Sequence, residues 1–171
     1  MNIIVVGQGA MGLLWYHHLA ISTAATNLSL LASTQHNLDD DNYYFSDHQG
    51  LAYQGKLNYA YDEEIKNADV IFLCVKSFKI NTALKKIAPQ LKAKTHIILA
   101  HNGMGTLAEL PKEFINQHNI YALLTTHGCL RETSLNITHT GIGITDIGLV
   151  SGRVDITEQQ ALTCLLNKAL P

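Results

Sequence analysis

Short runs of consecutive apolar residues alternate along the chain with longer stretches in which apolar residues recur every three or four positions. The runs predict buried strands at 3–6, 27–31, 68–75, 95–100 and 120–125. The periodic stretches predict helices at 11–21, 78–88, 106–114 and 157–168. Strands that alternate with helices in this way are typical of an α/β fold, in which a doubly wound, mainly parallel sheet has helices on both faces.

Two segments depart from this alternation. Residues 43–61 alternate weakly between apolar and polar positions and contain two glycines, which predicts a hairpin or short extra strands whose aromatic side chains cover the sheet edge. Residues 128–149 are rich in Gly and Thr, and they predict a short antiparallel C-terminal portion with strands near 137–139 and 144–147. Thr157, with Gln160 three positions later, has the pattern of a capping box at the start of the last helix.

A glycine-rich turn follows the first predicted strand. Gly7-Gln8-Gly9-Ala10-Met11-Gly12 has the spacing GxGxxG between a buried strand and a helix, which is the context in which this motif binds a dinucleotide. Gly7 permits a tight turn, Gly9 leaves room for a pyrophosphate, and Gly12 lets the helix pack closely on the strand. The helix N-terminus offers N–H groups to the phosphates. The turn predicts a Rossmann-type site over residues 1–171, and the alternative is a turn that serves packing only.

The residues after the second predicted strand bear on which dinucleotide fits. NAD-binding domains place a carboxylate about 20 residues beyond the glycines, where it binds the ribose 2′-OH. Here the first carboxylate is Asp39, so a 2′-phosphate is not repelled. The hydroxyls of Ser33 and Thr34 could donate to that phosphate, which favours NADP. No Lys or Arg stands there, and an ordinary polar turn explains the same residues.

Ligands of an open α/β sheet bind beyond the carboxyl ends of its strands, and two polar residues fall there. Lys76 follows the strand 68–75, and Asn102 follows the strand 95–100. A lysine at this place can pair with a carboxylate or a phosphate, and an asparagine can orient a carbonyl group or a nicotinamide. The alternatives are a solvated lysine at the start of a helix and a common Asn-Gly turn.

Composition narrows the classes of function. The chain is 47% apolar and 15% charged, which suffices for a globular core. A net charge of −2 gives no positive field for nucleic acid or an acidic membrane, and no apolar run approaches the roughly 18 residues of a membrane span. Three widely spaced cysteines favour a reducing, cytoplasmic location. The nine histidines lack the spacing of known metal sites, so no metal is expected.

Further blocks of residues are more specific than the glycine turn. They are Cys74-Val75-Lys76-Ser77, His101-Asn102-Gly103-Met104-Gly105-Thr106 with Glu109-Leu110, Thr125-Thr126-His127-Gly128 with Arg131, and His139-Thr140-Gly141-Ile142-Gly143 with Ile147-Gly148. Preceded by Gly7 to Trp15, and in this order, they resemble the N-terminal domain of ketopantoate reductases. Members of that family reduce 2-dehydropantoate to pantoate with NADPH, on the way to pantothenate and coenzyme A.

The resemblance implies roles for individual residues. The glycine turn would hold the pyrophosphate, Lys76 and Asn102 would act at the nicotinamide and the substrate, and the backbone at Cys129 would lie near the cofactor. The family often has an arginine for the 2′-phosphate where Ser33 stands here. Its general-acid lysine, together with a serine and a glutamate, belongs to a second, helical domain that has no match in this chain.

These observations lead to a hypothesis of function. The chain is expected to be the NADP-binding domain of a 2-dehydropantoate 2-reductase-like oxidoreductase, and to reduce a 2-keto acid negligibly on its own because the general acid is absent. We expect an apolar patch near 157–168, through which two copies could dimerise. Two alternatives stay open: a stand-alone NADP-binding module with a sensing or regulatory role, and a reductase of a different 2-keto acid.

Overall fold

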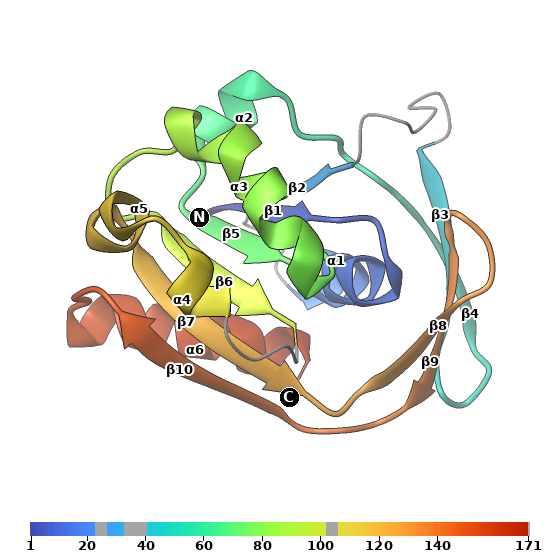
Figure 1. Cartoon of the computed structure of the whole chain (residues 1–171). Helices are drawn as coiled ribbons and strands as arrows, with labels where there is room; N and C mark the ends of the chain where they lie inside the picture. The colour runs from blue at the N-terminus through green and yellow to red at the C-terminus, as the bar shows by residue number, and fades with distance from the viewer. Residues whose placement is uncertain (23–26, 33–40, 102–105, 171) are drawn as a thin grey trace.

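A six-stranded sheet forms the centre of the protein in the computed structural model, which describes residues 1–22, 27–32, 41–101 and 106–170 (Figure 1). The strand order is β10-β7-β6-β5-β1-β2. All neighbouring strands are parallel except β10, which runs antiparallel to β7 at one edge. The strands are β1 (Asn2–Val6), β2 (Asn27–Leu31), β5 (Val70–Leu73), β6 (His96–Ala100), β7 (Asn119–Thr125) and β10 (Thr145–Ser151).

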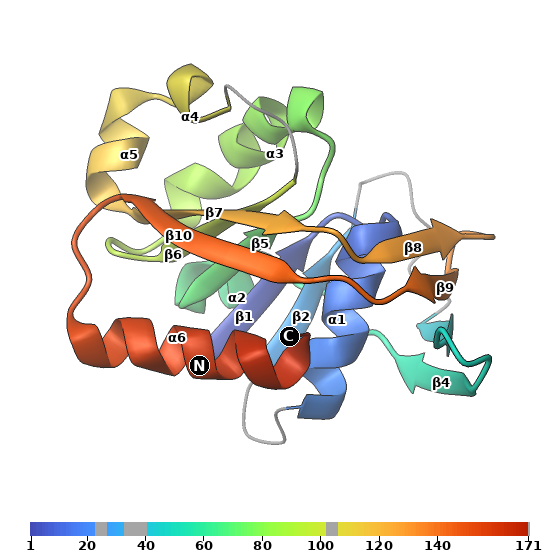
Figure 2. The ribbon, with the colours of Figure 1, turned by 90° about the horizontal axis from the view of Figure 1, so that it is seen from below.

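Helices cover both faces of this sheet. Successive strand residues point to opposite faces, so Ile3 and Val5 join the core on one side while Ile4 and Val6 join the core on the other. The first core lies under α1 (Ala10–Ser22) and α6 (Ile156–Ala169), and Figure 2 shows α1 next to the C-terminal end of α6. The second lies under α2 (Asp62–Asn67), α3 (Ile80–Ile87) and α5 (Lys112–Gln117). The predicted doubly wound α/β fold is confirmed.

Two predicted elements have different boundaries in the structure. The helix predicted at 106–114 is divided into α4 (Thr106–Glu109) and α5, because Pro111 between them has no N–H to continue the helical hydrogen bonds. The strand predicted at 68–75 is shortened to β5, and a 3₁₀ turn at Ser77–Lys79 precedes α3. The chain therefore leaves the sheet after Leu73, and the segment 74–76 lies at the carboxyl end of β5 with Lys76 exposed.

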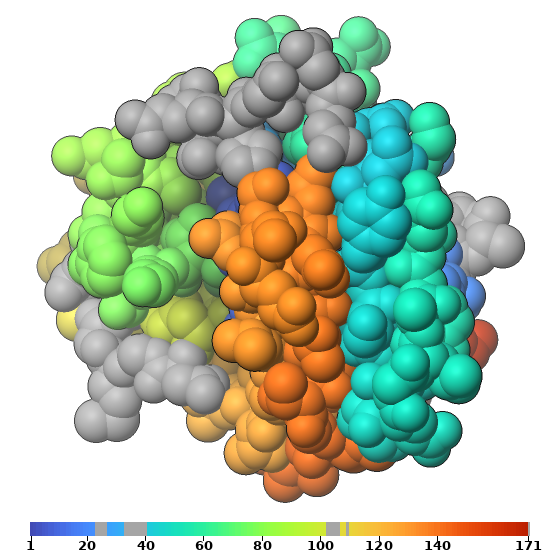
Figure 3. Space-filling view, turned by 90° about the vertical axis from the view of Figure 1, so that its right-hand side faces the viewer, coloured from blue at the N-terminus to red at the C-terminus, as the bar shows by residue number. Residues whose placement is uncertain are grey.

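A second sheet, which the sequence did not predict, packs on the outer side of α1. Its strand order is β4 (Ala52–Lys56), β3 (Asn42–Ser46), β9 (Asn136–Gly141) and β8 (Gly128–Arg131). Figure 3 shows the strands from the two distant parts of the chain lying against one another. The hairpin predicted at 43–61 is confirmed by β3 and β4. Tyr43 and Phe45 are buried against α1 rather than at the edge of the main sheet. Tyr59, from the same predicted segment, does lie at that edge, where it forms a parallel bridge with Leu30 of β2.

The predicted antiparallel C-terminal strands are confirmed, and they belong to two different sheets. β9 pairs antiparallel with β8 and parallel with β3 in the second sheet, whereas β10 returns to the main sheet beside β7. The reason is that β3 and β7 each offer an unpaired edge, and β9 and β10 each satisfy one of them.

The last helix begins one residue earlier than predicted and has a different cap. The carboxylate of Asp155 accepts hydrogen bonds from the backbone N–H groups of Thr157 at 2.8 Å and Glu158 at 2.9 Å. Thr157 is thus the second residue of α6, and the capping box predicted at Thr157 is wrong. An aspartate satisfies two amides at this position and also places a negative charge at the positive end of the helix.

We expect Asp155→Ala to lower the free energy of unfolding by about 1 kcal/mol, because two amides of the first turn lose their acceptor. Urea denaturation followed by circular dichroism measures this loss. Asp146→Ala removes an exposed carboxylate from β10 and serves as the matched control. An equal loss in both variants would assign the effect to net charge rather than to the cap.

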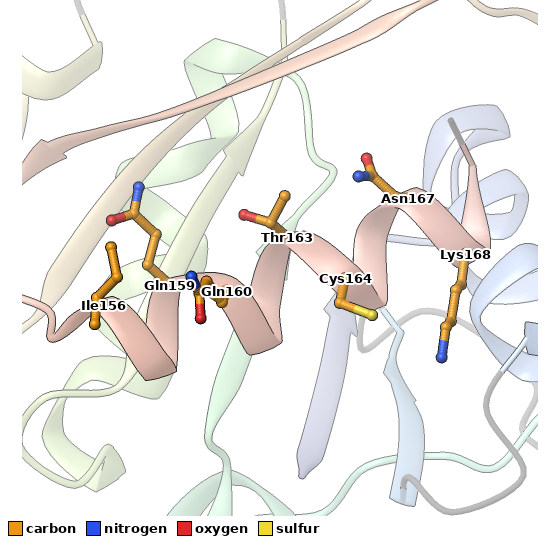
Figure 4. A pocket seen from close by; sticks show the side chains of 7 residues that line it. All are labelled: Ile156, Gln159, Gln160, Thr163, Cys164, Asn167 and Lys168. Carbon is orange, nitrogen blue, oxygen red and sulfur yellow. The ribbon is translucent and has the colours of Figure 1, made fainter.

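The outer face of α6 is polar. Figure 4 shows the side chains along it, which are Ile156, Gln159, Gln160, Thr163, Cys164, Asn167 and Lys168. Between residues 157 and 168 the leucines are all buried, so this stretch exposes no large apolar side chain. The predicted apolar patch is not found within 157–168, because the apolar side of α6 packs against the main sheet, and Ile156 directly before this stretch is exposed. Within the part of the chain that the structure describes, no helix is long and apolar enough to cross a membrane.

Candidate functional site

The structure gives a different explanation for each of the three glycines at the junction of β1 and α1. Gly7 has a φ of +111°, and a Cβ there would approach Val75 Cγ1 to 2.9 Å. A Cβ on Gly12 would overlap the carbonyl oxygen of Gly7, so the close contact of α1 with the turn requires a glycine. A Cβ on Gly9 would meet no described atom within 4 Å. Packing within the chain therefore requires glycine at positions 7 and 12 but not at position 9. A glycine at position 9 suits a place where a ligand approaches the backbone.

The start of α1 offers unpaired polar groups beside Gly9. The first helical hydrogen bond runs from Leu13 N–H to the Gly9 carbonyl at 3.0 Å, so the amides of Ala10, Met11 and Gly12 have no helical acceptor. The Gln8 side chain is only 8% exposed, and neither Oε1 nor Nε2 has a hydrogen-bond partner among the described residues. Buried polar atoms usually have a hydrogen-bond partner, so an ordered water or a polar ligand is expected at the Gln8 amide.

The strand β8 crosses this turn. Cys129 Sγ donates to the carbonyl oxygen of Ala10 at 3.5 Å, and Arg131 Nη1 donates to the carbonyl oxygen of Gln8 at 2.9 Å. Burial raises the pKa of the Cys129 thiol to about 11, so the thiol stays protonated at neutral pH and acts as a donor rather than as a nucleophile. The structure thus places Cys129 against the predicted cofactor loop.

A cavity of about 230 Å³ lies at the carboxyl ends of the parallel strands. Its wall comes from segments that follow β1, β5, β6 and β7, which is where an open α/β sheet binds ligands. The lining residues are Met11, Cys74, Val75, Lys76, Ala100, His101, Thr125 and His127. Lys76 supplies a positive charge to this wall. Burial raises the pKa of Cys74 to about 12, so this thiol remains neutral.

Three of the predicted site residues lie outside the described residues, namely Ser33, Thr34 and Asn102. The described residues that precede them in the chain show where each of these segments begins. Leu31, at the end of β2, accepts a hydrogen bond from Gly7 N at 3.1 Å, so the chain enters 33–40 beside the glycine turn. His101 lines the cavity directly before Asn102.

His127 connects the cavity with a group of histidines between α1 and the second sheet. Its Nδ1 lies 3.1 Å from Gly143 N and 3.1 Å from His139 Nε2. A backbone amide can only donate, so Nδ1 accepts, and a neutral His127 carries its proton on Nε2. His139 Nε2 lies beside this Nδ1 atom, and the His139 ring is also hydrogen-bonded to the backbone of Gly141. His18 and His48 lie beyond His139, with ring centroids 5.6 and 6.1 Å from it.

The other member of this group is His17, which stacks on Phe45 with ring centroids 3.8 Å apart. Its Nδ1 lies 3.1 Å from the hydroxyl of Tyr43. Sequence reasoning missed the group because its members come from α1, the β3–β4 turn, the connection from β7 to β8, and β9. Among the residues that the structure describes, no set of His, Cys, Asp and Glu has a geometry that could hold a metal ion.

The histidine group predicts a loss of stability in acid. Burial, followed by the neighbouring histidines, lowers the pKa of His17 and of His18 to about 4. Unfolding restores their ordinary pKa near 6.5, so the unfolded chain binds protons that the folded chain excludes. Stability is therefore unaffected by these groups above pH 6.5 and falls as the pH decreases from about 6.5 to 4. His17 contributes at most about 1.4 kcal/mol per pH unit to this slope.

Denaturation at several pH values between 4 and 7 measures the slope. His17→Phe keeps a ring against Phe45 but cannot be protonated, so its slope should be shallower than that of the parent chain. An unchanged slope would show that His17 is not one of the groups that exclude a proton.

Comparison with known proteins places the chain in a family. The sequence model of the family described as "Ketopantoate reductase PanE/ApbA" matches residues 3–152. The chain belongs to this family. A 2-dehydropantoate 2-reductase of Vibrio cholerae is 30% identical over 153 residues, which are 86% of this chain and 47% of that protein. The 2-dehydropantoate 2-reductase of Yersinia pestis is 28% identical over 100% of this chain and 53% of its own length. The chain thus spans about half the length of these ketopantoate reductases.

Solved structures show the same fold. A ketopantoate reductase from Ralstonia eutropha superposes with a TM-score of 0.78 at 20% identity, over 100% of this chain and 55% of its own. D-mandelate dehydrogenase in complex with NADH gives 0.73 at 19% identity, over 99% and 54% of the two chains. A ketopantoate reductase from Staphylococcus aureus that is described as dimeric gives 0.69 at 19% identity, over 96% and 56%. The resemblance noted in the sequence is therefore confirmed at the level of family and fold.

Proposed function

We propose that this chain is the cofactor-binding part of an NADPH-dependent reductase of the 2-dehydropantoate 2-reductase type. The observation that carries the proposal is the cavity at the carboxyl ends of β1, β5, β6 and β7, with Lys76 in its wall and Met11 of the glycine turn at its edge. Because the chain spans about half the length of its relatives, the proposal assigns it cofactor binding and one wall of the active site.

The residues beside this cavity fit a dinucleotide. Gly9 leaves open space, the first amides of α1 have no helical acceptor, and the buried Gln8 amide lacks a partner among the described residues. A dinucleotide bound there supplies the hydride. Lys76 would hold the carboxylate or the carbonyl oxygen of a 2-keto acid by its charge, and Asn102 would orient the carbonyl group. In this arrangement the chain binds and orients the reactants.

The choice of NADP over NAD is part of the proposal. The argument is the sequence after β2, where the hydroxyls of Ser33 and Thr34 are available and no carboxylate occurs before Asp39. A relative in fold, D-mandelate dehydrogenase, was solved with NADH and anilino(oxo)acetate. NADH and other 2-keto acids are therefore the comparisons that an experiment must include. The three free thiols suit a reducing cytoplasm, which we propose as the location.

Titration of the 171-residue chain with NADPH and with NADH, at matched ionic strength and followed by nucleotide fluorescence, tests the proposal. We expect weak binding with preference for NADPH. A stronger response to NADH would contradict the NADP assignment, and no response to either nucleotide at millimolar concentration would contradict the dinucleotide site. A single-turnover assay with ketopantoate and other 2-keto acids then tests the chemistry, for which we expect a negligible rate from this chain alone. Sedimentation in the same buffer tests whether two copies associate, as in the dimeric relative.

A further inference from the structure

The dinucleotide site proposed above has little positive charge in its own segment of chain. The first Lys or Arg in the sequence is Lys56, so β1, α1, β2 and the turns between them contain none. Lys56 itself lies 3.2 Å from Asp41 in an ion pair. A pyrophosphate carries about two negative charges, whereas a helix N-terminus supplies only about half a positive charge. Any side-chain cation that pairs with the pyrophosphate therefore comes from outside this segment.

Arg131 is in the right place to supply it. This residue is the last of β8, and its Nη1 donates to the carbonyl oxygen of Gln8, between the first two glycines of the turn. The strand is held there by pairing with β9 and by the contact of Cys129 Sγ with Ala10. Arg131 is therefore fixed at the glycine turn from a strand that follows it by more than 100 residues.

The guanidinium of Arg131 keeps most of its donors for a ligand. Among the described residues there are two ion pairs, Lys56 with Asp41 and Lys92 with Asp69, and Arg131 takes part in neither. The adjacent carboxylate of Glu132 accepts from Thr138 Oγ1 at 2.9 Å. A guanidinium has five N–H donors in a planar fork that matches two oxygens of a phosphate, and the Gln8 carbonyl uses one of them.

The buried amide of Gln8 is a second, independent sign of a ligand at this place. The backbone carbonyl oxygen of Gln8 accepts the hydrogen bond from Arg131. The side chain of Gln8 is buried, but its Oε1 and Nε2 have no hydrogen-bond partner among the described residues. The buried amide and the open space belong to the neighbouring residues Gln8 and Gly9, and the guanidinium is held by the backbone of Gln8. All three fit an oxygen-rich anion rather than an apolar group.

We propose that Arg131 is a further ligand-binding residue of the chain, whose guanidinium binds a phosphate of the dinucleotide at the glycine turn. The proposal rests on the proposed function above. The phosphate is either part of the pyrophosphate or the 2′-phosphate, and both present the same pair of oxygens to the arginine fork.

The test is a titration of the 171-residue chain with NADPH and NADH at low and at high salt. Arg131→Gln should weaken binding roughly tenfold or more, because a charge-assisted hydrogen bond is lost. Arg131→Lys keeps the charge without the fork and should lose less. Arg153→Gln is the matched control, because Arg153 is the only other arginine in the sequence. It lies in the connection from β10 to α6, far from β8 (Figure 2), so this variant should bind both nucleotides as tightly as the parent chain does. The difference between parent and Arg131→Gln should shrink at high salt.

The arms of this experiment separate the outcomes. Weaker binding of both nucleotides assigns Arg131 to the pyrophosphate, and weaker binding of NADPH alone assigns it to the 2′-phosphate. Parent-like binding by Arg131→Gln, in a chain that loses binding with Gly9→Asp, overturns the role of Arg131 and leaves the proposed function standing. Absence of binding by the parent overturns both. Thermal melting of each variant confirms that the differences arise in folded protein.

Discussion

A chain that carries Gly9→Asp is expected to lose dinucleotide binding by at least 100-fold while it unfolds at the same denaturant concentration as the parent. The substitution places a carboxylate where the pyrophosphate must approach the backbone, so both its volume and its charge oppose the ligand. Stability is expected to stay within about 0.5 kcal/mol, because a Cβ at Gly9 meets no described atom within 4 Å. Fluorescence titration with NADPH and urea denaturation measure the two effects.

Gly9→Ala provides the intermediate step for this prediction. It adds a methyl group without charge, so it should weaken binding less than the aspartate and leave the fold intact. If Gly9→Asp bound NADPH as tightly as the parent, the nucleotide would not lie on the glycine turn, and the cavity would have to be assigned to another ligand.

Gly12→Ala is expected to have the opposite profile, with a large loss of stability. A Cβ at Gly12 would overlap the carbonyl oxygen of Gly7 and would also approach Cys74 Cβ to 3.4 Å. The overlapped atom belongs to the backbone between β1 and α1, which cannot move without displacing the helix from the sheet. We therefore expect the free energy of unfolding to fall by about 3 kcal/mol or more, the upper range for overpacking. Urea denaturation of the variant measures it.

Gly148→Ala is the matched control for that experiment. Gly148 lies on β10, and a Cβ there would meet nothing within 4 Å, so the variant should be as stable as the parent. Equal stability of Gly12→Ala and Gly148→Ala would show that α1 lies farther from the glycine turn than the structure has it.

The main sheet could be predicted from the sequence because each of its strands is a local pattern. Continuous β-branched and leucine-rich runs such as those of β1 and β5 are buried on both faces, and helices with periodic apolar residues separate them. The second sheet could not be predicted, because β3 and β9 are far apart in the sequence and their pairing leaves no local signal. The alternation of Tyr43, Tyr44 and Phe45 shows that one face is buried but not what covers it.

The same distinction holds for the site. Gly7, Gly9 and Gly12 form a local motif, and Lys76 follows from the rule that strand ends meet at one edge of the sheet. Arg131 carried no assigned role, because nothing local shows that β8 crosses the glycine turn. One signal was available in the sequence: no Lys or Arg precedes Lys56, so any cation that contacts a phosphate in this segment comes from elsewhere.

The contact between β8 and the glycine turn also bears on how the protein assembles. Gln8 meets Arg131 across 123 positions of chain, and Ala10 meets Cys129 across 119. Closing such long loops costs chain entropy, which is recovered only when the late strands are in place. The turn can therefore form early with its own strand and helix, but it acquires its cover of β8 only near the end of folding. A nucleotide held by both parts would bind the finished fold selectively and would stabilise it by mass action.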